Sequence, residues 1–174
     1  MNGQSDNATV PSRTTVRIPT ASGDELEAWL YLPEGDGPHP AVVMAHGIGA
    51  IKAGGLAPFA ERFCREGFAA VVFDYRQWGG SSGQPREELS FPRQLEDYGT
   101  VIGWAATHPN IDEHRIFAWG TSFTGMYIVE FPQAFGREAR GRGTNPAALF
   151  ANCCLLLVST SQSLERPWQY AFRK

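Results

Sequence analysis

The sequence has few residues that bind metals and little excess charge. It contains three cysteines and four histidines in 174 residues, and none of them fall at the spacing of metal ligands. Few cysteines, two of them adjacent at 153 and 154, suit a reducing compartment. A net charge of -3 gives no basis for binding nucleic acid. We therefore expect a cytoplasmic chain with no metal, no other cofactor and no nucleic-acid partner.

Long apolar runs are also missing. The apolar stretch at 147–158 is too short to cross a bilayer, so we expect no membrane partner, although it could form a strand. The first twelve residues are polar and lack a charged-then-apolar leader, which predicts a disordered segment over 1–13 and no secretory signal. With 43% hydrophobic residues, the composition suits one α/β domain with many loops.

Three continuous apolar runs, at 41–45, 69–73 and 115–119, predict buried strands. Apolar residues recur at helical spacing between them, which predicts right-handed parallel crossovers. Upstream, 14–18 and 26–32 alternate polar with apolar residues around a turn, which predicts an antiparallel hairpin. The fold class is thus α/β, with a mostly parallel sheet and an N-terminal antiparallel hairpin. The helix-spaced residues are Leu56, Phe59, Ala60, Phe63, Cys64, Leu95, Tyr98, Ile102 and Ala105.

A serine follows the third run in a turn, Gly120-Thr121-Ser122-Phe123-Thr124-Gly125. A serine hydroxyl is a weak nucleophile that must be presented on a tight turn beside backbone N–H groups able to hold an oxyanion. Gly120 leaves room for such a turn, but Thr124 stands where the motif G-x-S-x-G has its second glycine. The alternative is an ordinary Ser/Thr-rich helix cap.

The first strand ends in His46-Gly47-Ile48-Gly49 and the second in a glycine-rich loop that starts at Asp74. Parallel strands end at one edge of a sheet, so these loops should converge on Ser122. A histidine at the end of a buried strand more often bonds loop carbonyls than acts as a base.

The remaining polar candidates lie elsewhere. His39 is expected in an exposed turn, and His108 and His114 at the amino end of the third strand, which is the wrong edge for chemistry. Asp112 there should cap a turn through its side chain. On the helix at about 92–107, Glu96 and Asp97 are expected to be solvated, with a buried structural role as the less favoured alternative.

Taken in order, Ala-His-Gly-Ile-Gly, Phe-Asp-Tyr-Arg-Gln-Trp-Gly-Gly-Ser, His-Pro-Asn-Ile-Asp and Trp-Gly-Thr-Ser-Phe resemble the α/β-hydrolases. The branch most similar holds fungal polyketide transferases and dienelactone-hydrolase-like or X-Pro-peptidase-like proteins. The resemblance implies a three-layer sandwich acting on a small-molecule ester, thioester or lactone. It assigns Ser122 as nucleophile, the backbone N–H groups of Phe123 and Ile48 as the oxyanion hole, and mainly structural roles to Asp74 and Arg76.

The rest of the resembled pattern is not found. No histidine and no aspartate follow Ser122, and only Glu130, Glu138 and Glu165 carry a carboxylate there. The family places its acid and histidine after the serine. Residues 1–131 hold 9 basic and 16 acidic side chains, whereas 132–174 hold 6 and 2. We therefore expect a partial domain over 14–131, a poorly ordered tail over 132–174, and a missing C-terminal part of the fold.

Two hypotheses follow. The first is a serine hydrolase or acyl transferase that forms an acyl-enzyme on Ser122, with secondary metabolism as one implied setting. The second is a truncated, catalytically dead family member or a non-catalytic binding module, because the acid and histidine are missing.

Overall fold

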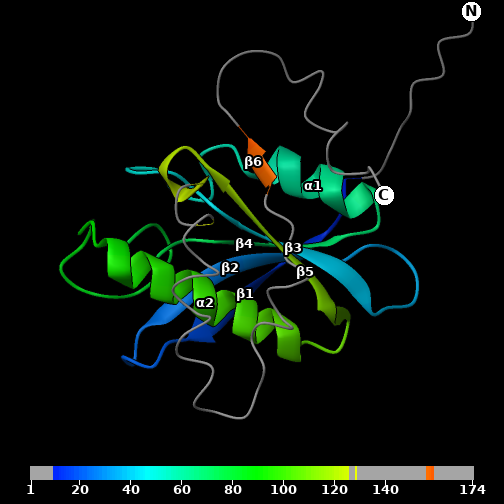
Figure 1. The fold of residues 1–174 in the computed structure, drawn as a ribbon, viewed down its shortest axis with the longest axis horizontal. Coiled ribbons are helices and arrows are strands. Elements are labelled where there is room, and N and C mark those ends of the chain that lie inside the picture. Colours follow the sequence, from blue (N-terminus) through cyan, green and yellow to red (C-terminus); the bar gives the residue numbers. More distant parts are fainter. Residues whose placement is uncertain (1–9, 126–127, 129–155, 159–174) are drawn as a thin grey trace, which may run out of the picture.

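The computed structural model describes residues 10–125, 128 and 156–158, and these form three layers. A sheet in the order β1-β2-β4-β3-β5-β6 lies between helices α1 and α2 (Figure 1). The strands are β1 Arg13–Pro19, β2 Glu25–Tyr31, β3 His39–Ala45, β4 Ala69–Phe73, β5 Ile111–Thr121 and β6 Leu156–Val158, and the helices are α1 Ala57–Arg65 and α2 Phe91–Thr107.

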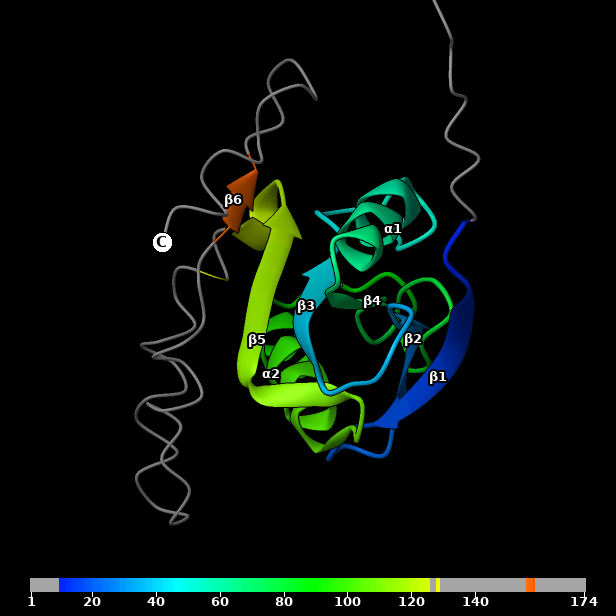
Figure 2. The same cartoon turned by 90° about the vertical axis from the view of Figure 1, so that its right-hand side faces the viewer.

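Alternation along the strands builds one core on each face of the sheet. In β3, Val43 faces the α2 side, while Val42 and Met44 face α1. Residues of the two helices complete these cores, so the helices cover opposite faces (Figures 1 and 2). The helical residues are Tyr98, Val101, Ile102 and Ala105 from α2, and Ala60, Phe63 and Cys64 from α1, with Leu56 directly before α1.

The topology confirms the predicted fold class. Strand β3 lies between β4 and β5 and pairs with both in parallel. Strands β1 and β2 form the expected antiparallel hairpin, and β2 continues the sheet by pairing antiparallel with β4. From the apolar stretch at 147–158, β6 adds a strand parallel to β5. Of the segment 1–13 that the sequence predicts to be disordered, residues 1–9 lie outside the described residues and Arg13 already belongs to β1; of the predicted tail 132–174, only 156–158 are described.

Two of the parallel strands, β3 and β5, begin earlier than the sequence predicts. His39 is not in an exposed turn: it opens β3 and is paired with Ile111 of β5, and its N–H donates to the carbonyl of Asn110 at 2.9 Å. Strand β5 therefore starts at Ile111, where a loop was expected. A register shift between His39 and Ala41 accommodates the extension, since Pro40 has no N–H to offer the ladder.

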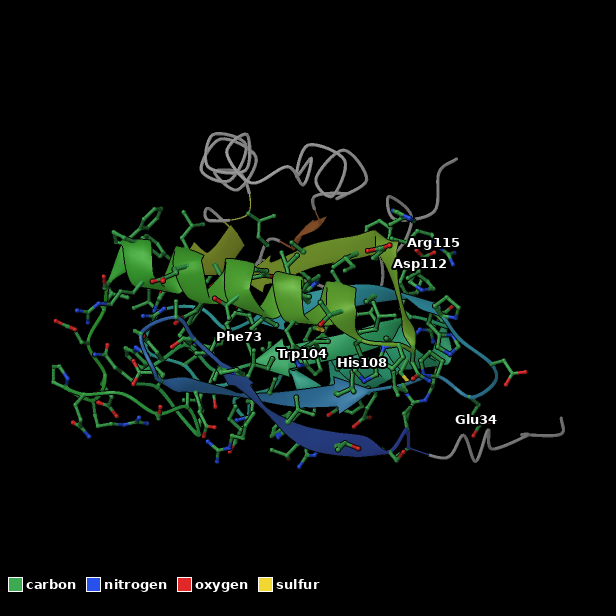
Figure 3. The ribbon with its side chains drawn as sticks, turned by 90° about the horizontal axis from the view of Figure 1, so that it is seen from below. Glu34, Phe73, Trp104, His108, Asp112 and Arg115 are labelled. Atoms are coloured by element: carbon green, nitrogen blue, oxygen red, sulfur yellow. The ribbon has the colours of Figure 1, made fainter. Side chains whose placement is uncertain are left out.

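The amino-terminal end of β5 carries a polar turn (Figure 3). Asp112 accepts a hydrogen bond from the His114 N–H at 2.9 Å, which confirms the expected turn cap. Its other oxygen accepts from Arg115 Nε at 2.5 Å, and these contacts hold the pKa of Asp112 below its ordinary value. Figure 3 shows Asp112 beside Arg115 and, separately, Trp104 beside His108, whose ring centroids are 5.4 Å apart.

Asp97 corrects the expectation of a solvated helix face. Its side chain is completely buried and accepts hydrogen bonds from the Arg76 N–H at 2.8 Å and from Arg76 Nε at 2.6 Å. Glu96, which also binds Arg76, remains half exposed as expected. Burial raises the pKa of Asp97 to about 6, while the bonds from Arg76 oppose the shift. A partner on a distant loop thus decides the burial of this helical carboxylate.

No helix among residues 10–125, 128 and 156–158 is long and apolar enough to cross a membrane.

We predict that Asp97→Ala lowers the free energy of unfolding by about 3–5 kcal/mol, because it leaves the Arg76 guanidinium buried without its main partner. The matched control is Glu96→Ala, which removes an exposed partner of the same guanidinium and should cost about 0–1 kcal/mol. Urea unfolding at pH 7 measures both. Equal losses in the two variants would contradict the structural role of Asp97.

Candidate active site

Strand pairing brings the two glycine-bearing turns together. Ala45 at the end of β3 is paired in parallel with Gly120 of β5, so the chain leaves both strands at the same edge. A Cβ added to Gly47 would lie 2.9 Å from the Cβ of Ser122 and 3.5 Å from its Oγ. The loop after His46 and the serine turn are therefore in contact, as the sequence predicts.

Ser122 has the strained backbone of an elbow. Its φ is 53°, in the left-handed region that a non-glycine residue adopts only under constraint. A helix N-cap would have extended backbone instead, so the cap interpretation fails here. Ser122 is exposed at the end of β5, directly before helical residues 123–125. Among the described residues its hydroxyl has no hydrogen-bond partner, and its role as nucleophile stays a prediction.

Gly120 and Thr124 pack against each other across the turn. A Cβ on Gly120 would lie 2.5 Å from Thr124 Cγ2 and 2.9 Å from its carbonyl carbon. Thr124 is buried, and its hydroxyl donates to the carbonyl of His46 and lies 3.1 Å from the hydroxyl of Tyr75. The threonine at the second glycine position is thus accommodated with both of its polar contacts satisfied.

The structure places the two predicted oxyanion donors on adjoining turns. Ile48 follows Gly47, the residue in contact with Ser122, and Phe123 follows Ser122 itself. In the described part of the chain no acceptor is found for the Ile48 N–H. The Ile48 side chain is half exposed, and the Phe123 ring packs edge-on against Phe91 with centroids 6.2 Å apart.

His46 is buried, and neither of its ring nitrogens makes a hydrogen bond to Ser122. Nδ1 lies 2.9 Å from the Gly47 carbonyl, which confirms the expected bond to a loop carbonyl. Nε2 faces Asp74 Oδ1 at 3.6 Å, too long for a hydrogen bond. Burial lowers the pKa of His46, more than the Gly47 bond and the Asp74 charge raise it. The ring is thus neutral at pH 7, with its proton on Nδ1.

Asp74 fixes the loops beside the site, as its predicted structural role requires. Oδ1 accepts the Lys52 N–H at 2.6 Å, and Oδ2 accepts from Lys52 Nζ at 2.5 Å and the Gly80 N–H at 2.9 Å. Lys52 is buried and also bonds Glu27 at 2.7 Å. Sequence reasoning missed Lys52, because a single lysine in a loop carries no pattern that marks it. No group of three potential metal ligands forms among the described residues.

Comparison with known proteins agrees with this geometry. The family model described as X-Pro dipeptidyl-peptidase (S15 family) matches residues 22–131. The chain belongs to this family. Its fold is that of an α/β-hydrolase: the crystal structure of the α/β-hydrolase GrgF from Penicillium sp. sh18 superposes with a TM-score of 0.66 and 29% identity, over 71% of this chain and 42% of that one.

Curated relatives include enzymes named for hydrolysis. The chain is 46% identical over 105 residues to the quorum-quenching protein AidA of Acinetobacter baumannii, covering 60% of this chain and 34% of AidA. It is 39% identical over 114 residues to the thiohydrolase aneE of Aspergillus aculeatus, covering 66% and 35%. The chain therefore spans about a third of the length of these two relatives. The matches support the predicted hydrolase or acyl-transferase family.

We predict that Gly120→Ala destabilises the chain by about 1–3 kcal/mol, because the new Cβ would overlap Thr124. The matched control is Gly103→Ala in α2, where a Cβ would meet nothing within 4 Å. That change should stabilise by about 0.5–1 kcal/mol, since glycine is unfavourable inside a helix. Thermal or urea unfolding measures both, and a stabilised Gly120→Ala would disprove the tight elbow.

His46 gives a pH prediction whose sign follows from its lowered pKa. The unfolded chain takes up a proton near pH 6.5 while the folded chain resists it, so the stability tied to neutral His46 is present above pH 6.5 and declines below it. We expect the stability advantage of the wild type over His46→Asn to shrink from pH 7 to pH 5. Urea unfolding at each pH tests this, and an advantage that grows would show a protonated His46.

Proposed function

We propose that this chain carries the nucleophile and oxyanion-binding part of a serine hydrolase or acyl transferase. The observation that carries the proposal is the strained, exposed Ser122 in contact with the Gly47 loop. A hydroxyl on a turn with backbone N–H groups on both sides is the arrangement needed to attack an ester, thioester or lactone carbonyl.

In the proposed reaction, Ser122 Oγ attacks the carbonyl carbon while a base takes its proton. The carbonyl π electrons move to oxygen, and the N–H groups of Phe123 and Ile48 hold that oxyanion. When the carbonyl re-forms, the bond to the alkoxide or thiolate breaks and the leaving group takes up a proton, which leaves an acyl ester on Ser122. Water or an acceptor hydroxyl then releases the acyl group, giving hydrolysis or transfer respectively.

The surroundings of Ser122 favour an acyl compound as substrate. The exposed Ile48 side chain and the Phe91–Phe123 pair offer apolar contacts beside it, and aneE is named a thiohydrolase. We propose a small-molecule thioester or ester as the partner, and neither a nucleic acid nor a membrane. The free, buried Cys64 supports a proposed cytoplasmic location.

The base is the part that this sequence leaves open. No histidine or aspartate follows Ser122, and the nitrogens of His46 face Gly47 and Asp74. We propose that this sequence corresponds to part of a longer hydrolase. The proposal is supported by the relatives, of which this chain covers only 34% and 35%. The second candidate, a non-catalytic binding module, is favoured by the same missing groups. Without a base, catalysis from the oxyanion hole and binding alone reaches roughly 10³ to 10⁴ over water.

A fluorophosphonate probe, which phosphonylates activated serines, tests this proposal. We expect the chain alone to label slowly or not at all at neutral pH, and rapid stoichiometric labelling would mean that His46 or another group acts as base. Grafting the C-terminal part of a full-length relative, where the family pattern places the acid and the histidine, should restore labelling at Ser122. Ser122→Ala in the graft is the control and should abolish it. A folded graft that remains unlabelled would favour the binding module.

A further inference from the structure

Thr124 joins the serine turn to the loop that follows His46. Thr124 is buried and lies two residues after Ser122, at the position where the motif G-x-S-x-G has its second glycine. Its hydroxyl donates to the carbonyl of His46 across 78 positions in the chain. A glycine at 124 could not make this contact, so the departure from the motif adds a bond between the two halves of the site.

The number of hydroxyl protons decides which group donates in each hydrogen bond around Thr124. A threonine hydroxyl has one proton, which goes to the His46 carbonyl. The Tyr75 hydroxyl, 3.1 Å away, must therefore donate to Thr124 Oγ1. Tyr75 follows β4, Thr124 follows β5 and His46 follows β3. One buried chain of hydrogen bonds thus connects the ends of three neighbouring strands at the edge that holds Ser122.

Two successive peptides of the His46 loop are fixed in this way. Thr124 holds the carbonyl of His46, and the His46 ring donates from Nδ1 to the carbonyl of Gly47. In a trans peptide the N–H points opposite to the carbonyl. Holding the Gly47 carbonyl toward the imidazole therefore turns the Ile48 N–H away from the ring, and holding the His46 carbonyl toward Thr124 ties that loop to the helix that begins at Phe123.

We propose that Thr124 is a positioning residue that sets the separation of the two oxyanion donors, the N–H groups of Ile48 and Phe123. Thr124 itself touches no reacting atom. It follows Phe123 directly, so moving the His46 carbonyl relative to Thr124 moves one donor relative to the other. This inference rests on the proposed function for its catalytic meaning, while the tie between the two turns is testable without any activity.

Amide hydrogen exchange provides that test on the full chain. The Ala50 N–H bonds the Gly47 carbonyl at 3.3 Å and so reports on that peptide, while the Lys52 N–H, bonded to Asp74, is a reference within the same loop. In Thr124→Val, which keeps the shape and removes the hydroxyl, we expect Ala50 to exchange on the order of tenfold faster, the loss of one hydrogen bond. Lys52 should be unchanged, and Thr124→Ser should restore Ala50.

Three outcomes would overturn the proposal: Ala50 unchanged in a folded Thr124→Val, Ala50 and Lys52 accelerated equally, or Thr124→Ser behaving as Thr124→Val. If Thr124→Val does not fold, Thr124→Ala replaces it, since it also removes the hydroxyl that binds the His46 carbonyl, and an unchanged Ala50 in that variant also overturns the proposal. In the grafted chain, Thr124→Val should slow fluorophosphonate labelling while Thr124→Ser retains it. A graft that never labels refutes the proposed function. The exchange rate of Ala50 then still tests whether Thr124 holds the His46 loop to the serine turn.

Discussion

The parallel pairing of β3 with β5 is the constraint on which the rest of the site depends. Parallel strands leave a sheet at the same edge. Because Ala45 is paired with Gly120, the turns that follow β3 and β5 begin next to each other. The contact between Gly47 and Ser122 follows from that register. A slip of one residue would reverse the faces of a strand buried on both sides and separate the turns, so core packing and site geometry select the same register.

Buried charges then hold the loops that this pairing brings together. Asp74 binds Lys52 and the Gly80 N–H, and Asp97 binds both the backbone and the guanidinium of Arg76. Taking such ions out of water costs free energy that their attraction offsets only in good geometry. Their effect is mainly on position: each carboxylate fixes one loop to another element through a backbone N–H as well as a cation.

Local patterns in the sequence were sufficient to predict the central strands, the N-terminal hairpin and the serine turn. Apolar runs located the parallel strands, alternation located the hairpin, and the spacing around Ser122 indicated the strained turn, because each of these depends on neighbours in the chain. The misses involve partners far apart in sequence. Asp97 is buried because Arg76 reaches it from another loop, and His39 opens β3 because Asn110 accepts its N–H. No local pattern marks Lys52 or the bond from Thr124 to His46 for the same reason.

The structure separates two requirements of acyl transfer that are often described together. Under the proposed function, stabilising an oxyanion needs backbone N–H groups held in place, and strand register, two close glycine contacts and the Thr124 hydroxyl order the turns that carry the proposed donors. Removing the serine proton needs a base within hydrogen-bond reach, but the unprotonated Nε2 of His46 faces Asp74 and makes no hydrogen bond to Ser122. In this arrangement the His46 ring therefore holds the Gly47 peptide through Nδ1 and makes no contact with the Ser122 hydroxyl that would let it act as base. The hydrolase and the binding-module hypotheses therefore share every feature of the described fold and differ only in whether a proton acceptor reaches Ser122.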